Sequence, residues 1–118
     1  MPPWRSHMYQ CSEEELAESL QAGYLQIAGA EHHVVLSHAP PRGSKVDRTF
    51  SGRHVGSTAL RSFIEETQPS LVLCGHIHEG RGTEQIGRTP VVNCGPAAVG
   101  CYALVDLNRL ADVQLARA

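Results

Sequence analysis

The chain has 118 residues, of which 42% are hydrophobic and 19% are charged, a composition that excludes a disordered or fibrous protein. Ten lysines and arginines against twelve aspartates and glutamates give a net charge of −2, so no basic excess indicates a nucleic acid or an anionic membrane as partner. No apolar run approaches the roughly 20 residues that span a bilayer, and no signal-peptide pattern follows Met1. We therefore expect a cytoplasmic protein without a membrane segment.

The N-terminal part is expected to be an arm followed by a helix. Residues 1–11 contain two prolines and no periodic pattern, so we interpret them as an irregular arm before a single partial domain over residues 12–118. Ser12 and Glu15 have the spacing of a capping box, which predicts a helix start. Gly23 is the expected C-terminal stop of this helix.

Two predicted strands flank a second predicted helix. Residues 33–37 and 71–74 are short, nearly continuous apolar runs, the pattern of strands buried on both faces. Residues 38–56 are a loop without periodicity, and Ser57 caps a helix that Pro69 closes. This order predicts a right-handed βαβ crossover between two parallel strands.

The C-terminal third is predicted to be mostly β-structure. Residues 83–86 and 89–93 flank a two-residue turn typical of a hairpin, and Pro90 places the second of these strands near an edge or a bulge. Residues 101–107 form a further expected strand, and residues 111–115 are interpreted as a strand rather than a helix. The expected fold class is thus α/β, with one mixed sheet, a βαβ crossover, a hairpin and flanking helices.

The four cysteines are expected to be free thiols. None belongs to a CxxC pair or has zinc-finger spacing, and Cys74 and Cys101 lie in apolar runs where a thiol behaves as a small hydrophobe. Nothing in the sequence indicates an oxidising compartment, so disulfides are not expected.

Histidines carry the main chemical signal, because the chain contains seven of them. His38 follows the first predicted strand, and His76 and His78 follow the second. The carboxyl ends of neighbouring parallel strands meet at one edge of a sheet, and residues i and i+2 of an extended segment project to the same side. A lone HxH pair is ordinarily a solvated pair, but the third histidine favours a metal site formed by His38, His76 and His78.

Two further residues are candidates for substrate binding. His54 precedes the second predicted helix and is either a surface residue or one that reaches a bound phosphate. Asp47 is either a charged loop residue or a residue that supports the site. The remaining polar residues of note are expected to be solvated histidines (His7, His32, His33), surface arginines (Arg81, Arg88) and a turn-forming asparagine (Asn93).

Several of these segments together resemble a known family. Residues 36–41 (LSHAPP) and 72–78 (VLCGHIH) resemble the last two metal-binding motifs of the calcineurin-like metallophosphoesterases, and residues 47–49, 54–57 and 86–96 are also similar to that family. The resemblance covers most of residues 12–107. It implies an αββα sandwich with two divalent ions (manganese, iron, zinc or nickel) that hold a phosphoester and activate a bridging water.

The resemblance also assigns ligands and shows what is missing. By it, His38 and His76 bind one metal ion and His78 binds the other. The DxH, GDxxD and GNH motifs of the family do not occur, because none of the three aspartates has the required neighbours and no asparagine directly precedes a histidine. We therefore expect the C-terminal half of the family's domain. Adjacent cations repel without a bridging anion, so this chain alone is expected to hold at most one ion weakly and to be inactive.

Other functions remain open at this stage. A non-catalytic binding or scaffold module could retain the same fold, and a sheet without its partner sheet would expose apolar surface and favour homo-oligomers. A metallo-β-lactamase-like hydrolase also uses HxH after a strand, but Glu79 and Gly80 do not provide the Asp-His continuation that it needs.

Overall fold

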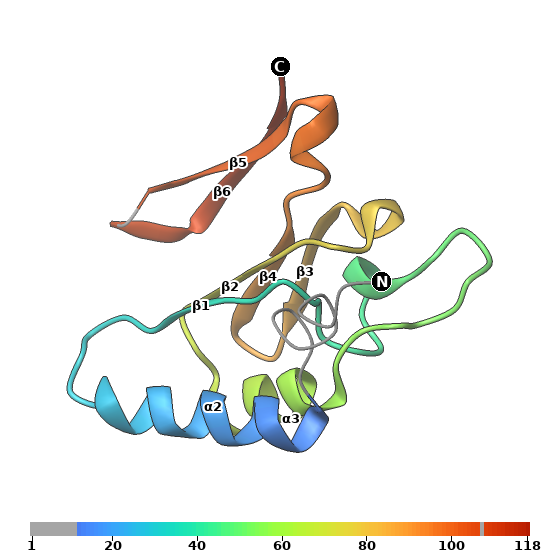
Figure 1. The fold of residues 1–118 in the computed structure, drawn as a ribbon. Coiled ribbons are helices and arrows are strands. Elements are labelled where there is room, and N and C mark those ends of the chain that lie inside the picture. Colours follow the sequence, from blue (N-terminus) through green and yellow to red (C-terminus); the bar gives the residue numbers. More distant parts are fainter. Residues whose placement is uncertain (1–11, 107) are drawn as a thin grey trace, which may run out of the picture.

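A four-stranded mixed sheet lies between two helices on one face and a two-stranded sheet on the other (Figure 1). The computed structural model describes residues 12–106 and 108–118, so the expectations for residues 1–11 and Leu107 lie outside the described part. The strand order is β1-β2-β4-β3 in the larger sheet and β5-β6 in the smaller. The strands are β1 (Val34–Leu36), β2 (Leu71–Cys74), β3 (Gly82–Ile86), β4 (Thr89–Asn93), β5 (Cys101–Asp106) and β6 (Arg109–Arg117).

Helix α2 (Glu13–Gln26) begins as predicted and ends later than predicted. Ser12 Oγ accepts a hydrogen bond from the Glu15 N–H at 3.0 Å, and Glu15 Oε1 accepts one from the Ser12 N–H at 3.1 Å, which confirms the capping box. The helix continues through Gly23, so the expected stop is wrong. Tyr24 lies edge-on to Phe63 and His33, and we attribute the extra turn to this packing, which offsets the weak helix propensity of glycine.

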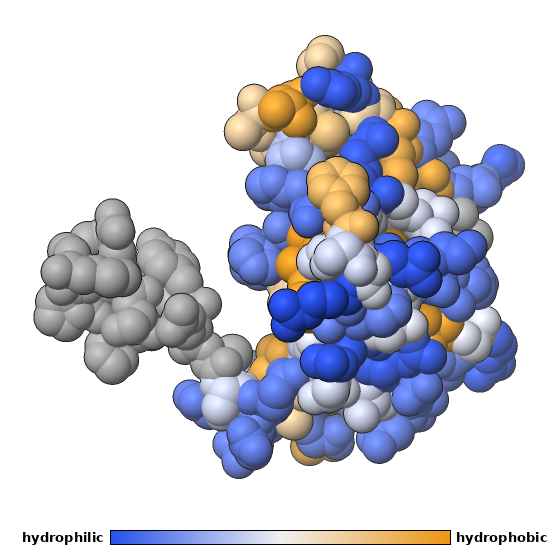
Figure 2. Space-filling model, turned by 90° about the vertical axis from the view of Figure 1, so that its right-hand side faces the viewer, coloured by the Kyte–Doolittle hydropathy of each residue, from blue (hydrophilic) through white to orange (hydrophobic). Residues whose placement is uncertain are grey.

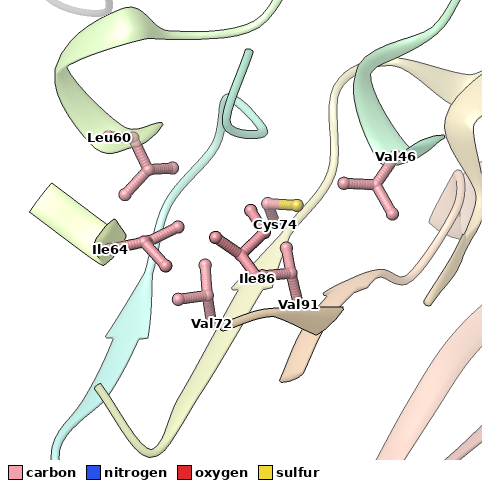
Figure 3. Close-up of a cluster of buried hydrophobic side chains, with 7 residues drawn as sticks. All are labelled: Val46, Leu60, Ile64, Val72, Cys74, Ile86 and Val91. Carbon is pink, nitrogen blue, oxygen red and sulfur yellow. The ribbon is translucent and has the colours of Figure 1, made fainter. Parts of the chain in front are cut away.

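Helix α3 (Thr58–Thr67) forms as predicted and provides the centre of the core. Ser57 Oγ caps it by accepting from the Leu60 N–H at 3.0 Å. Leu60 and Ile64 are fully buried and point toward the sheet (Figure 3). The other members of this cluster are Val46, Val72, Cys74, Ile86 and Val91.

The predicted parallel pairing of the two strands of the βαβ unit is confirmed, but one of these strands is less buried than expected. Strands β1 and β2 pair in parallel, with Val35 opposite Val72. Strand β1 is at the edge of the sheet, where Leu36 is 84% exposed and only Val35 packs against the core. Burial on both faces was therefore wrong for β1, because an apolar run does not specify whether a neighbouring strand will cover it.

The hairpin of β3 and β4 is confirmed, with Ile86 opposite Thr89 across the turn. Strand β4 is interior, between β2 and β3, and it pairs with β3 without a register shift, so neither the edge position nor the bulge inferred from Pro90 is found. Pro90 is accommodated because the pairing of β4 with β2 begins only at Val91, after the residue that lacks an N–H.

The C-terminal segment is a strand, as interpreted, and the β5–β6 hairpin covers the second face of the main sheet. Leu71 and Val92 are buried there against Leu110. Because this hairpin covers that face, exposed apolar side chains are found at the β1 edge and on β5, where Tyr102 and Leu104 are exposed, rather than across the whole sheet.

Cys74 and Cys101 are buried free thiols, as expected, and burial raises the pKa of Cys74 to about 12. In the described part of the chain, neither helix combines the length and the apolar character that crossing a bilayer requires.

Candidate metal centre

His38 and His76 meet at the C-terminal edge of the main sheet. His38 lies two residues after β1 and His76 two residues after β2, and the parallel pairing of these strands brings both loops to one edge. His38 Nε2 lies 2.9 Å from His76 Nδ1, and the ring centroids are 4.5 Å apart. Both side chains are exposed, so the pair is accessible to an ion from solvent.

The loop after β2 places His76 by an unusual backbone conformation. His76 has a φ of +62°, in the left-handed region that a residue with a Cβ rarely adopts. Directly before His76, the Gly75 N–H donates a hydrogen bond to the His38 carbonyl at 3.1 Å. The two histidine loops are therefore bonded to each other through the backbone as well as through their rings.

His78 is exposed and does not join this pair. The expected side-by-side projection of His76 and His78 required an extended segment, but the positive φ at His76 and a 3-10 turn over His78–Gly80 bend the chain there. Among residues 12–106 and 108–118, no group of three or more histidine, cysteine, aspartate or glutamate side chains is arranged to hold a metal ion.

The donor chemistry of the pair fits one divalent ion as two of its ligands. Two nitrogens bound at about 2.1 Å to one ion lie about 3.0 Å apart at the right angle of an octahedral site and about 3.4 Å apart at the tetrahedral angle of zinc, so the separation of the two ring nitrogens, 2.9 Å, is closer to the octahedral case. Imidazole suits several first-row metals, including zinc, iron and nickel. The same residues do not fit two adjacent ions. Among the described residues, no carboxylate is grouped with the His38–His76 pair to offset the repulsion between two cations.

Asp47 and His54 lie together in the loop that follows His38. Asp47 is fully buried and accepts a hydrogen bond from His54 Nδ1 at 2.6 Å. It also accepts from the backbone N–H groups of Gly43, Ser44 and Gly56. Burial alone would raise the pKa of the Asp47 carboxyl, but the hydrogen bonds from His54, Gly56 and Gly43 outweigh burial and hold its pKa below the ordinary value.

Gly56 shows how tightly this loop is folded. A Cβ at Gly56 would lie 2.4 Å from the Pro40 carbonyl oxygen and 2.9 Å from the Asp47 Cβ. Only glycine therefore allows the strand-like segment after His54 to pack against the residues that follow His38.

Asn93 has a larger structural role than the turn former expected from the sequence. Its side chain is fully buried and its Nδ2 donates to the Val46 carbonyl at 3.0 Å and to the Ile77 carbonyl at 2.8 Å. It thereby joins the Asp47 loop to the loop that carries His76. The one available sequence signal was its position at the end of β4, directly beside the predicted site.

The comparison with family models decides the classification of the chain. The model for "Metallophosphoesterase, calcineurin superfamily" matches residues 20–117. The chain belongs to this superfamily. Divalent metal ions are the general cofactors of calcineurin-superfamily metallophosphoesterases, which agrees with the donor chemistry of the His38–His76 pair.

Related proteins are longer than this metallophosphoesterase chain. An uncharacterized protein of Methanocaldococcus jannaschii is 39% identical over 72 residues, which are 58% of this chain and 33% of that protein. A UPF0046 protein of Caenorhabditis elegans is 36% identical over 62 residues, which are 52% of this chain and 15% of that protein. The chain therefore spans a third or less of these relatives.

Solved structures show the same fold over a similar share. One crystal structure, at 31% identity, superposes with a TM-score of 0.65 over 82% of this chain and 38% of its own. The crystal structure of TT1561 of Thermus thermophilus superposes with a TM-score of 0.56 at 21% identity, over 84% of this chain and 40% of its own. The layers of the described residues thus match part of a metallophosphoesterase fold.

Proposed function

We propose that this chain supplies histidine ligands to a divalent metal centre that hydrolyses phosphoester bonds. The observation that carries the proposal is the 2.9 Å approach of His38 Nε2 and His76 Nδ1 at the ends of adjacent parallel strands. These are the residues that the resemblance to the superfamily assigns to one metal ion. His78 is the proposed ligand of a second ion. A change in the loop after β2 would have to bring His78 within reach of that ion.

Each of the chain's own groups has a defined part in this proposal. A divalent ion bound there would polarise the phosphoester and activate water. His38 and His76 hold that ion, and the loops after β1 and β2 fix the two rings through the bonds of Gly75 and Asn93. Charge balance between two ions requires carboxylates, and residues 12–106 and 108–118 group none with the pair, so we propose that the chain by itself is inactive.

The test is metal binding by the purified chain and its single variants. We expect the unaltered chain to bind Co²⁺ or Zn²⁺ in a one-to-one ratio, measured by titration calorimetry and by the visible spectrum of bound Co²⁺. His38→Ala and His76→Ala should each abolish binding. His32→Ala is the matched control, because His32 is an exposed histidine before β1, at the opposite end of that strand.

Two results would contradict the proposal. Equal metal stoichiometry in the His38→Ala, His76→Ala and His32→Ala variants would remove the shared site. Hydrolysis of an aryl phosphate or a phosphodiester by the chain alone with Mn²⁺ would refute the requirement for carboxylates from elsewhere.

A second candidate function is an interaction module that uses the unpaired edge of β1. The observation that favours it is the 84% exposure of Leu36 on a strand with a neighbour on one side only. Sedimentation analysis of the chain and of Leu36→Lys tests it. Homo-oligomers that dissociate in the variant would support this candidate, and a monomer in both cases would refute self-association through β1.

A further inference from the structure

The loop that follows His38 contains an ordered hairpin over residues 48–54. Arg48 and His54 form an antiparallel bridge, and the Thr49 N–H donates to the Arg53 carbonyl at 2.9 Å. The turn closes through the Gly52 N–H, which donates to the Thr49 carbonyl at 2.9 Å. In Figure 1 this hairpin belongs to the green loop that extends far from the sheet beyond α3.

This hairpin concentrates positive charge in an acidic chain. Residues 40–56 contain four of the ten lysines and arginines, and Asp47 is the single acidic residue among them. Asp47 is fully buried and already bonded to His54 and to three backbone N–H groups. Arg48 and Arg53 are exposed and form no ion pair with another residue of the described chain. Figure 2, viewed from the side to which the loop extends, shows a predominantly hydrophilic surface.

His54 differs from an ordinary surface histidine because Asp47 fixes its ring. An ionised carboxylate only accepts hydrogen bonds, so the contact of 2.6 Å places a proton on His54 Nδ1. His54 Nε2 makes no hydrogen bond within the described residues, and a third of the side chain remains exposed. The second ring nitrogen is therefore available to a ligand in a ring held by a buried acid.

The hairpin is also attached to the segment that follows His38. The Ser57 N–H donates to the Pro40 carbonyl at 2.8 Å, and the Arg42 N–H donates to the Ser57 carbonyl at 2.9 Å. On the other side, Asn93 joins Val46, the neighbour of Asp47, to the loop of His76. The base of the loop that carries the positive hairpin is thus anchored at the edge of the sheet where the histidine pair lies, and the hairpin projects from that base (Figure 1).

We propose that the 48–54 hairpin is an anion site that binds the phosphate group of the substrate through His54 and Arg48. These two residues pair across the hairpin and share one face, whereas Arg53, the chain neighbour of His54, lies on the opposite face. The identity of the anion as a substrate phosphate rests on the proposed phosphoesterase function. The binding itself does not require a metal ion, because the Arg48 guanidinium donates to the phosphate, and His54 Nε2 accepts from a protonated phosphate oxygen or, in a ring that carries both protons, donates to the anion.

The experiment is a titration of the chain with inorganic phosphate in the presence of EDTA, followed by NMR of the histidine rings and backbone amides. We expect saturable shifts at His54 and at the amides of residues 48–54. Arg48→Gln should weaken phosphate affinity about fivefold, as expected for an exposed charge-assisted hydrogen bond, and Arg53→Gln, on the opposite face, should weaken it less. Arg109→Gln removes the same charge from an exposed position in the β5–β6 hairpin and should leave the affinity unchanged.

The results separate this inference from the proposed function. An absence of phosphate shifts at His54, or equal weakening by Arg109→Gln, would overturn the anion site even if His38 and His76 bind metal. Phosphate binding at the hairpin in a chain that fails to bind metal would support the anion site and contradict the metal centre. The amide spectrum of each variant also reports whether it is folded, and His54→Gln, which lacks the ring, should bind phosphate more weakly while it retains that spectrum.

Discussion

On the helix side of the sheet, Leu60 and Ile64 are fully buried, whereas at its C-terminal edge His38 and His76 are exposed and hydrogen-bond to each other. Within the described residues, every buried side-chain nitrogen and oxygen has a hydrogen-bond partner. The interior is thus well packed with its polar groups hydrogen-bonded, while the edge presents the nitrogens of His38 and His76, the proposed metal ligands, with no carboxylate of the described residues grouped with them. We infer that folding and metal chemistry are separable in this chain, and that substitutions can affect one without the other.

The largest expected effect on the interior alone is that of Leu60→Ala. Leu60 is completely buried between α3 and the sheet, so truncation removes apolar contacts and leaves a cavity. The free energy of unfolding should fall by about 3 kcal/mol, measured by urea denaturation. Metal affinity of the folded fraction should not change, and a parallel loss of affinity would show that core and edge are coupled.

Asp47→Asn should have the next largest effect on the free energy of unfolding. It tests the loop after His38, which lies between the core and the histidine pair. The asparagine amide keeps one oxygen and has an NH2 donor in place of the other, so part of the network from Gly43, Gly56 and His54 is lost. We expect a loss of about 2 kcal/mol in the free energy of unfolding at neutral pH.

The pH dependence of stability identifies the carboxylate as the cause. The pKa of Asp47 is lowered in the folded chain from its ordinary value of 3.8, so its contribution is fully present above that pH. It is lost as the pH falls through the lower folded pKa. The difference in stability between the unaltered chain and Asp47→Asn should therefore shrink below about pH 4. A difference that is constant across this range would contradict the role of the ionised carboxylate.

Local sequence patterns predicted most elements because the deciding groups are close together in the chain. The capping box of Ser12 and Glu15 and the apolar spacing in α3 are contained within single helices, and both were confirmed. The burial of β1 and the position of β4 within the sheet could not be predicted from such local patterns. Leu36 is exposed because β1 has one neighbour, and Pro90 is interior because β2 pairs only from Val91.

The candidate site shows the same division between local and distant information. The approach of His38 and His76 follows from the parallel βαβ order, which the apolar runs predicted. The bend at His76 and the bonds of Asn93 to two separate loops depend on contacts far apart in the sequence, so the pattern HxH could not exclude a turn between its two histidines. The pairing of Asp47 with His54, although local, depends on a hairpin that has no hydrophobic period.

The smallest expected effect on stability is that of His76→Gly. This substitution distinguishes the core from the edge most sharply, because stability and metal binding should change in opposite directions. His76 has a φ of +62°, where a Cβ costs about 1 kcal/mol and glycine has no such cost. His76→Gly should therefore raise the free energy of unfolding by about 0.5–1 kcal/mol and abolish metal binding. His76→Ala, which keeps the Cβ, is the matched control and should abolish binding without any gain in stability. A gain in stability in both variants would mean that the imidazole pair, rather than the backbone of His76, is the source of strain. The difference between the core and the edge of the sheet would then include repulsion between the His38 and His76 rings.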